Sequence, residues 1–200
     1  QGEFIRLSNF SSDIAHELRT PLTNIITQTQ VGLSKKRQSE EYQELLFSNL
    51  EELERLTKMV NDMLWLAKSQ NGLIKPAQDI LSSHEEIEVL FEYFDALAEE
   101  SSLILHKAGE NISFYCDKLH FRQLLSNLLS NAIRYAPKGS SITVCSEITS
   151  AEKVCICVSN TGEKIPSAHL PYLFDRFYRS DKSRQRHSDG AGLGLAIVKA

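Results

Sequence analysis

Residues 12–22 read SDIAHELRTPL, an amphipathic helical pattern with one histidine outside its apolar stripe. Ile14 and Leu18 stand one helical turn apart and mark the side that is expected to face a core. At about 100° per residue, His16 lies roughly 200° around the helix from Ile14, so its imidazole is expected to face solvent. Thr20 stands one turn further along and shares the face of His16.

Two neighbours could make this histidine reactive. Glu17 can reach the imidazole with its carboxylate, orient the ring and favour the tautomer whose other nitrogen is a free nucleophile. Pro21 removes a backbone donor one turn after Glu17, which is expected to bend the helix beside the histidine. Taken by itself, the pattern is also that of an ordinary surface histidine on an amphipathic helix.

The composition indicates an ordinary globular chain. Its 200 residues are 42% hydrophobic and 24% charged, values that fit one or two domains and do not suggest disorder. A net charge of -4 argues against a broad nucleic-acid-binding face. No apolar run approaches the roughly 18 residues of a membrane span, so this stretch is expected to be soluble, with further chain upstream. A local basic cluster, suited to one phosphate group, comprises Arg176, Arg179, Lys182, Arg184 and Arg186.

The cysteines predict packing rather than metal binding. None has paired C-x-x-C spacing, and Cys155 and Cys157 alternate in an apolar, strand-like run, so they are expected to share one face. We expect small buried side chains in a reducing compartment, with a zinc or redox role as the less favoured alternative. The other two cysteines are Cys116 and Cys145.

Helical spacing over residues 5–34, and again up to about residue 70, predicts a helical hairpin with a polar turn at residues 35–40. Two helices alone enclose too little core. The apolar seam therefore predicts that the hairpin pairs with a second copy, giving a homodimer with a four-helix bundle. In the second arm this seam comprises Leu46, Leu53, Leu56, Val60, Met63 and Ala67.

The pattern changes after the second helix. Asn71-Gly72 ends that helix, and Pro76 marks a break between two units. We divide the chain into a helical domain at residues 1–71, a linker at 72–80 and an α+β sandwich at 81–200.

The second domain is expected to mix helices and strands. The polar segment 160–190 is longer than an ordinary loop and is expected to act as a lid. Helices are expected at residues 84–100, 118–135 and from about 192, and strands at 103–106, 112–116, 142–148 and 153–159.

Two asparagines stand one turn apart in the expected helix 118–135. Asn127 and Asn131 both fall on its polar side and could present amide oxygens to a hard cation. Mg²⁺ suits such a site because it accepts few protein ligands and keeps phosphates and waters as the others. Arg134 adds a cation near the same place. A solvated polar face explains the two asparagines equally well when they are taken alone.

Three alternate glycines open the last expected helix, in the sequence GAGLGLA at residues 190–196. Gly190, Gly192 and Gly194 would let backbone N–H groups approach an anion at the positive end of the helix dipole. The same spacing also occurs in hinges and in tight packing turns.

Taken in order, these pieces resemble the cytoplasmic core of a bacterial two-component sensor histidine kinase, over nearly the whole chain. The resemblance implies an ATP-binding domain of the histidine kinase, gyrase and chaperone type after the dimerising hairpin. The stretch 170–186 looks most like the heavy-metal-sensor branch, particularly its copper- and peroxide-responsive enteric members. The motifs are the phosphoacceptor box at 16–21, the asparagine box at 127–137, the first glycine box at 158–166, the phenylalanine box at 173–179 and the second glycine box at 190–196.

The resemblance implies that His16 is phosphorylated from Mg-ATP and passes the phosphoryl group to an aspartate of a response regulator receiver domain. Glu17 would take the proton from, or hydrogen-bond, the far ring nitrogen of His16. Thr20 would hold a water for the reverse, phosphatase reaction. Arg179 would contact the γ-phosphate. Mg²⁺ would be held by Asn131 and Asn127, and the nucleotide by Asn127, Asn131, Arg134, Tyr135, Asn160, Gly162, Gly190, Gly192, Leu193 and Gly194.

Two positions depart from the family pattern. Asn160 replaces the aspartate that accepts a hydrogen bond from the adenine amino group, although its amide oxygen can still accept that bond without charge. Lys164 replaces the second glycine of the first glycine box. The chain also stops at Ala200, where the resemblance implies further strands. We therefore expect weaker nucleotide binding and an incomplete ATP-binding domain.

Two other functions stay open. The same nucleotide fold serves hydrolytic ATPases, in which a glutamate activates water, but Asn127 stands at that position and cannot accept a proton. A non-catalytic dimeric scaffold that binds a response regulator is suggested by the departures at Asn160 and Lys164. The resemblance implies that the chain is the cytoplasmic portion of an inner-membrane protein, works as a homodimer and has no nucleic-acid partner.

Overall fold

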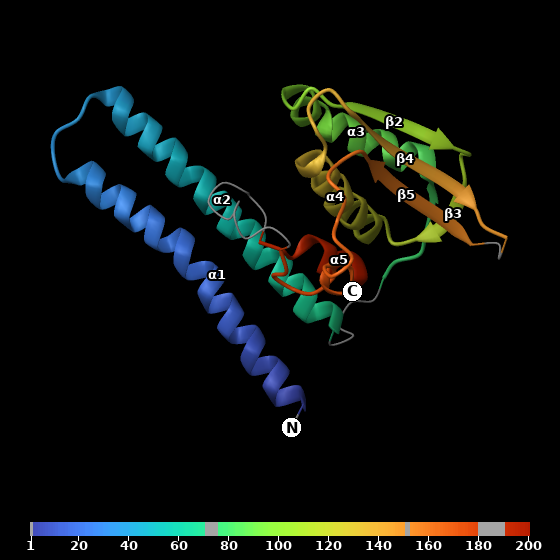
Figure 1. Cartoon of the computed structure of the whole chain (residues 1–200), viewed down its shortest axis with the longest axis horizontal. Coiled ribbons are helices and arrows are strands. Elements are labelled where there is room, and N and C mark those ends of the chain that lie inside the picture. The colour runs from blue at the N-terminus through green and yellow to red at the C-terminus, as the bar shows by residue number, and fades with distance from the viewer. Residues whose placement is uncertain (1, 71–75, 151–152, 180–190) are drawn as a thin grey trace.

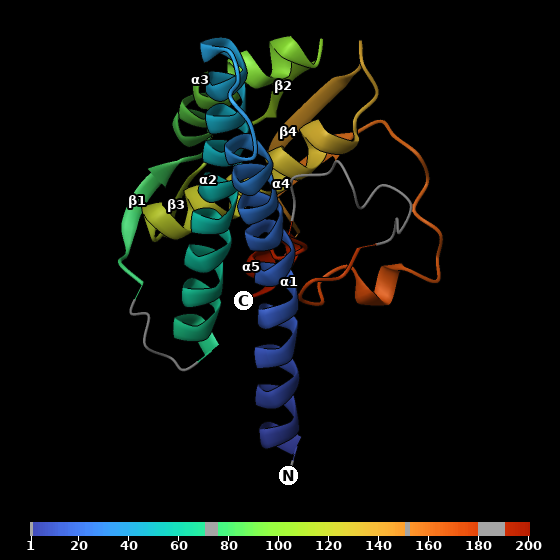
Figure 2. The ribbon, with the colours of Figure 1, turned by 90° about the vertical axis from the view of Figure 1, so that its left-hand side faces the viewer.

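The computed structural model has two parts, a long helical hairpin and an α/β domain (Figure 1). α1 (Gly2–Leu33) and α2 (Ser39–Gln70) form the hairpin and run antiparallel, which confirms the predicted helical arms. The α/β domain lies against the C-terminal half of α2 in both ribbon views (Figures 1 and 2). The structure describes residues 2–70, 76–150, 153–179 and 191–200.

Polar contacts fix the turn of the hairpin and the start of α2. The backbone N–H of Gln38 donates to the Glu41 carboxylate at 3.0 Å. This bond satisfies a backbone N–H group that has no partner within the helix, because it lies at the helix start. Arg37 Nη1 pairs with the same carboxylate at 3.3 Å. Further along, Asn49 Nδ2 of α2 donates to Thr29 Oγ1 of α1 at 3.1 Å, which ties the two helices at one level.

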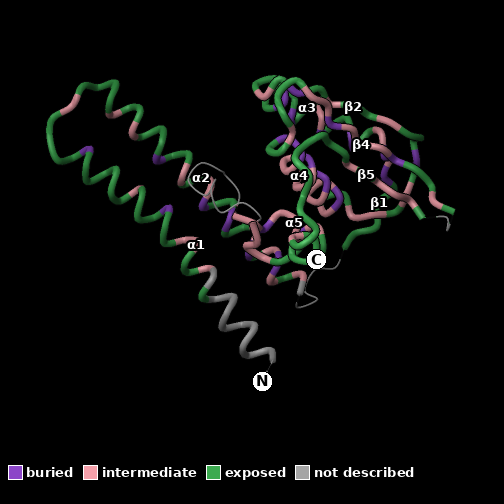
Figure 3. The backbone as a smooth tube through the Cα atoms, in the orientation of Figure 1, coloured by how far each residue is buried: buried purple, intermediate pink, exposed green. Residues whose placement is uncertain are grey.

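Most described residues of the hairpin are exposed or half-buried (Figure 3), and large apolar residues are among the exposed ones. Leu46, Leu50 and Leu64 of α2 are each more than half exposed, and Leu22 and Ile26 of α1 are 46% and 55% exposed. Of the described helices, none has the length and apolar character of a membrane span. Single apolar residues on a surface are ordinary, but rows of them along two helices mark a surface for association.

The α/β domain is a mixed fold, as predicted. In chain order its elements are β1 (Asp79–Ser82), α3 (Ser83–Glu100), β2 (Ile104–Gly109), β3 (Ser113–Cys116), α4 (Lys118–Tyr135), β4 (Ser141–Ile148), β5 (Val154–Asn160), the short 3-10 helix η1 (Leu170–Tyr172) and α5 (Gly194–Lys199). β1 pairs antiparallel with β3. The second sheet has the order β2-β4-β5, in which β2 and β4 are parallel and β4 and β5 are antiparallel.

Each helix and strand predicted for this domain is present within a few residues of its expected place. The sequence pattern does not predict β1, because four residues with only Leu81 buried are too few to show an alternation. β1 begins at Asp79, inside the segment 72–80 that the sequence assigns to a linker.

The core of the α/β domain lies between the helices and the sheets. Leu125 and Leu129 of α4 and Ile142 and Val144 of β4 have no exposed surface. Side chains of this kind gain most of their stabilisation from removal of apolar surface from water. The core, called the first cluster below, consists of Leu81, Ile87, Leu90, Phe94, Ala98, Leu103, Phe121, Leu125, Leu129, Ala132, Ile133, Ile142 and Val144.

Asp117 caps α4 and also holds the chain that leads into β1. Its carboxylate accepts from the backbone N–H of His120 at 2.9 Å and from that of Ala77 at 2.7 Å. These two bonds lower the pKa of Asp117 from its ordinary value, because they favour the charged form. The start of α4 therefore anchors the connection between the two parts of the chain.

A buried ion pair joins α3 to α4. Burial raises the pKa of Glu86, but hydrogen bonds from Arg122 and Lys118 outweigh this and leave the pKa below its ordinary value. Arg122 Nε lies 2.5 Å from one carboxylate oxygen and Lys118 Nζ lies 3.3 Å from the other. Glu86 is thus charged and fully paired at neutral pH.

Candidate functional site

His16 lies on α1 with its side chain in solvent, which confirms the expected orientation. The neighbouring Leu18 is half-buried, because it packs against an apolar cluster formed by α2 and the region of α5. α1 continues through Pro21, which is itself buried, so the proline does not end the helix. The histidine therefore stands on the outer face of an unbroken helix.

The side chains nearest His16 in sequence are placed unequally. Thr20 is exposed like His16, in keeping with one shared helix face. Glu17 is half-buried, and within the described part of the chain no hydrogen bond joins it to the His16 ring. Adjacent residues of a helix diverge by about 100°, so contact between these two requires Glu17 to bend around the helix.

Asn127 faces Gly194, the first residue of α5. Its Nδ2 donates to the Gln123 carbonyl one turn earlier on α4 at 2.9 Å. Its other amide atom, Oδ1, lies so close to Gly194 that a Cβ at that position would come within 3.1 Å of it. The asparagine motif and the second glycine motif, far apart in sequence, thus meet here. Asn131 lies one turn further along α4 and is half-buried.

A second junction lies where β5 ends beside the end of α4. A Cβ at Gly162 would lie 3.1 Å from the Tyr135 carbonyl oxygen and 3.3 Å from Asn160 Nδ2. A side chain at this position would therefore crowd both neighbours. Asn160 Nδ2 donates to the Thr161 carbonyl at 2.8 Å. This bond engages the amide nitrogen and leaves Oδ1 as an acceptor for a donor group of a ligand.

A third junction joins the phenylalanine motif to the second glycine motif. Gly192 has a φ of +70°, and a Cβ there would lie 2.8 Å from Phe177 Cα, so only glycine fits. The backbone N–H of Phe177 donates to the Gly192 carbonyl at 2.9 Å. Phe177 itself has a φ of 60°. This bond holds the segment that carries Arg179 against the glycine turn.

The basic residues of the candidate site differ in burial. Arg179 is half-buried beside the glycine turn, whereas Arg134 is exposed in the last turn of α4. Partial burial lowers the pKa of the Arg176 guanidinium from its ordinary value. Six residues named in the sequence predictions lie outside the described residues: Asn71, Gly72, Lys182, Arg184, Arg186 and Gly190.

The described side chains suit a magnesium ion bound together with phosphate. Among the described residues, no group of three or more His, Cys, Asp or Glu side chains could hold a metal ion. Mg²⁺ commonly takes only one or two protein oxygens and completes its octahedron with phosphates and waters. Asn127, whose Nδ2 is already bonded, offers Oδ1 for this purpose, and half-buried Asn131 offers a second amide oxygen.

A contact between the two parts of the chain was not expected from sequence. Leu193 is only 1% exposed, because its side chain belongs to an apolar cluster shared with α2. Half-buried Ile14 and Leu18, on either side of His16, pack against the same group. Met63, which sequence analysis places in the dimer seam, instead faces α5. This second cluster consists of Met59, Met63, Leu66, Leu193, Ala196 and Ile197.

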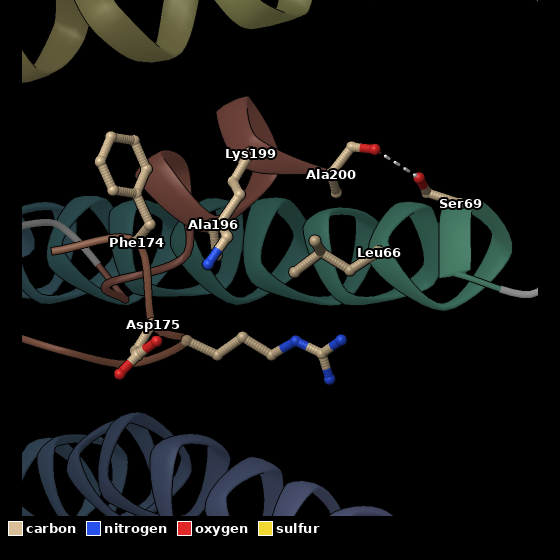
Figure 4. Close-up of a pocket in the computed structure, with 8 residues that line it drawn as sticks. Leu66, Ser69, Phe174, Asp175, Ala196, Lys199 and Ala200 are labelled. Carbon is tan, nitrogen blue, oxygen red and sulfur yellow. Dashed lines mark hydrogen bonds between the residues drawn. The ribbon is translucent and has the colours of Figure 1, made fainter. Parts of the chain in front are cut away.

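A cavity of about 490 Å³ lies between α2, α5 and the phenylalanine motif (Figure 4). Ser69 Oγ donates to the Ala200 carbonyl at 3.3 Å at one end of it. Neither Asn127 nor Asn160 lines this cavity, so it is distinct from the three junctions. Its lining residues are Leu66, Ser69, Phe174, Asp175, Arg176, Ala196, Lys199 and Ala200.

Comparison with known proteins identifies both parts of the chain. Residues 6–72 match the His Kinase A (phospho-acceptor) domain, and residues 116–200 match the histidine kinase-, DNA gyrase B-, and HSP90-like ATPase. The sensor histidine kinase CusS of Escherichia coli (strain K12) is 50% identical over 98% of this chain, which spans 41% of that relative.

Solved structures share the fold. The histidine kinase AdeS of Acinetobacter baumannii has a TM-score of 0.75 at 25% identity, over 92% of this chain and 83% of the AdeS chain. The histidine kinase ThkA, solved in complex with the response regulator protein TrrA, has a TM-score of 0.74 at 22% identity, over 90% of this chain and 53% of that one.

Proposed function

This chain belongs to the sensor histidine kinases, and we propose that it is the part that transfers the γ-phosphoryl group of ATP to His16 and then to a response regulator. One observation carries the proposal. The asparagine, phenylalanine and two glycine motifs, spread from residue 127 to 196, meet at three junctions, two of which involve α4, while His16 stays exposed on α1. This arrangement supports a nucleotide-binding surface and a separate, accessible acceptor in one chain.

The chain's own groups would bind and orient the nucleotide. Asn160 Oδ1 would accept a hydrogen bond from the adenine amino group, and the glycine at 162 keeps that position open. Backbone N–H groups of the turn at Gly192 would bind phosphate, with Leu193 contributing through its backbone. Asn127 and Asn131 would hold Mg²⁺, which when bound neutralises phosphate charge and orients the leaving group.

Phosphoryl transfer depends on positioning and on neutralising the charge of the transferred group. Arg179, held beside the glycine turn, would contact the γ-phosphate, and Arg134 would add a second positive charge. Glu17 would accept a hydrogen bond from the far nitrogen of His16 and so make the near nitrogen more nucleophilic. Thr20, on the same face, would position water for removal of phosphate from the regulator.

The exposed apolar rows of the hairpin support a homodimer, with Leu22, Ile26, Leu46 and Leu50 in its seam. The acceptor would be the receiver domain of a response regulator, docked on the hairpin near His16. On this proposal, the chain consists of a phosphotransfer domain at residues 1–71, a linker at 72–80 and a catalytic domain at 81–200. A membrane anchor at the inner membrane would lie upstream of this chain.

Incubation with γ-labelled ATP and Mg²⁺ tests the proposal. We expect wild type to take up label that is labile to acid and stable to base, as a phosphohistidine is. His16→Gln should lose the label completely, because it removes the acceptor nitrogen. His106→Gln changes an exposed histidine on β2 and should keep it.

The failures of this test are informative. Label that survives in His16→Gln would refute His16 as the acceptor. Release of inorganic phosphate without labelled protein would favour a hydrolytic ATPase. Nucleotide binding without labelled protein and without release of phosphate would favour the non-catalytic scaffold. Asn160→Ala, measured with a fluorescent ATP analogue, should weaken nucleotide binding by roughly tenfold if its amide accepts the adenine hydrogen bond.

A further inference from the structure

Three of the chain's four cysteines lie on the outer face of the β2-β4-β5 sheet. Along β4, Val144 and Ser146 are buried toward the helices, so Cys145 between them points the other way. Along β5, the half-buried Ile156 and Val158 pack on the first cluster, which turns Cys155 and Cys157 outward. The predicted shared face is present, but it is not the core face.

The strand register places Cys145 directly opposite Cys157. The backbone N–H of Thr149 donates to the Lys153 carbonyl at 2.9 Å, which marks that pair as hydrogen-bonded. Because the two kinds of pair alternate along an antiparallel ladder, the Cys145 and Cys157 pair is of the same kind. Its Cα atoms are then about 5.5 Å apart, inside the range of roughly 4.4–6.8 Å that disulfides span.

The two thiols differ in access. Cys157 is exposed, whereas Cys145 is half-buried, so a soluble oxidant would meet Cys157 first. The sequence analysis expects buried packing residues, and this exposed thiol departs from that expectation. Ser159 Oγ lies 3.9 Å from Cys157 Sγ on the same face, so the thiol has a polar neighbour rather than an apolar pocket.

We propose that Cys145 and Cys157 form a reversible redox site that reacts with oxidised thiols such as glutathione disulfide. The Cys157 thiolate attacks one sulfur of glutathione disulfide, the sulfur–sulfur bond breaks and one glutathione thiolate leaves. Cys145, after losing its proton to water, attacks Cys157 Sγ and expels the second glutathione. The protein loses two electrons and two protons, and glutathione disulfide becomes two glutathione molecules.

The bond would be strained and therefore easily reduced. Paired residues of this kind hold their Cβ atoms about 5 Å apart, whereas a disulfide needs roughly 3.5–4.5 Å. Closing the bond draws β4 and β5 together locally. Strained, exposed disulfides have higher reduction potentials and are the labile ones. In a reducing compartment such a pair stays as two thiols and closes only when the proportion of glutathione disulfide rises, which suits a switch better than a permanent crosslink.

The position of the pair links it to the nucleotide site. β5 ends at Asn160, three residues after Cys157, and Asn160 pairs with Ile142 on the same two strands. Movement of β5 at Cys157 is therefore transmitted along the strand to the adenine-binding amide. Resting on the proposed function, we expect the disulfide to weaken nucleotide binding by about tenfold, because a misplacement of about 1 Å is costly for groups that position a ligand.

Mass spectrometry of the whole 200-residue chain tests the chemistry directly. After treatment with glutathione disulfide and alkylation of free thiols, we expect two alkylated cysteines, a mass lower by two hydrogens and one linked peptide pair joining Cys145 to Cys157. Cys145→Ser should stop at the mixed disulfide on Cys157. Cys155→Ser, the matched control on the same face, should still close the bond.

Four alkylated cysteines, or a link that uses Cys155 or a second chain, would overturn the site. Binding of a fluorescent ATP analogue, measured before oxidation, after it and after dithiothreitol, tests the coupling. Affinity that is unchanged by a completed disulfide would refute the coupling to Asn160. If the chain binds no nucleotide before oxidation, yet forms the disulfide afterwards, the proposed adenine site is refuted instead. The two failures are therefore distinguishable.

Discussion

The two apolar clusters of this molecule differ in what they join. The first cluster lies inside the α/β domain, where α3, α4 and the sheets meet, and several of its side chains have no exposed surface. The second cluster lies between α2 and the α5 region and is bordered by half-buried residues, including Ile14 and Leu18. The first cluster holds a domain together, whereas the second holds one domain against another.

This difference has an energetic consequence. Stabilisation by burial grows with the apolar area removed from water, so the larger first cluster contributes most of the folding free energy of its domain. Contacts between domains of one chain are smaller and permit relative motion. The second cluster also borders His16, so its loss would change how the histidine and the ATP domain approach each other without unfolding either.

The largest expected effect on stability comes from the first cluster. Leu125→Ala should lower the free energy of unfolding by about 3 to 4 kcal/mol, because it removes a fully buried side chain and leaves a cavity. Urea denaturation measures this. Leu119→Ala is the control on the same helix, since Leu119 is 78% exposed and should change stability by less than about 0.5 kcal/mol. Equal effects would contradict the assigned core.

A smaller effect is expected for the buried ion pair beside this cluster. Glu86→Gln should cost about 2 to 3 kcal/mol, because Arg122 and Lys118 lose their charged partner. Glu88→Gln, whose exposed carboxylate pairs with Lys107, should cost less than about 1 kcal/mol.

The same pair predicts a pH dependence. Because the folded-state pKa of Glu86 is below its ordinary value of 4.5, the unfolded chain takes up the proton first. The stabilisation is present above pH 4.5 and is lost as the pH falls through the lowered pKa. Wild type and Glu86→Gln should therefore converge in stability in acid. A difference that stays constant with pH would contradict an ionised Glu86.

The smallest effect on domain stability is expected from the second cluster. Leu66→Ser should leave the unfolding of the α/β domain nearly unchanged but separate it from the hairpin, because Leu66 is 1% exposed between them. Small-angle scattering should show a longer molecule, and proteolysis near the linker should become faster. Lys68→Ser changes an exposed neighbour on α2 and should do neither. An unchanged scattering profile in Leu66→Ser would show that the second cluster does not hold the domains together.

Local patterns predicted most of the fold. The helices of the hairpin, the solvent-facing His16 and the pair Asn127 and Asn131 on one side of α4 follow from periodicity, because each depends on neighbours within one or two turns. β1 escaped prediction because four residues carry too little pattern. The asparagine, phenylalanine and glycine motifs meet at the three junctions, whereas His16 stays apart from them on α1. The catalytic roles of these residues stay predictions.

Periodicity does not determine which surface each apolar stripe packs against. Met63 belongs to the apolar stripe of α2, yet it packs on α5, and the same spacing is equally compatible with a partner copy. Cys157 sits in an apolar run, yet its side chain faces outward, because alternation in a strand specifies two faces without saying which is buried.

The sequence by itself determined the order of the helices and strands other than β1 and the short η1, the exposed histidine and the five motifs that mark a kinase core. Only the tertiary structure decided that Gly194 lies against Asn127, that Leu193 is buried on α2 and that Cys145 faces Cys157. The physical reason is range. Propensity and periodicity act within a few residues, whereas these contacts depend on how whole elements pack and on which strand register fills the core.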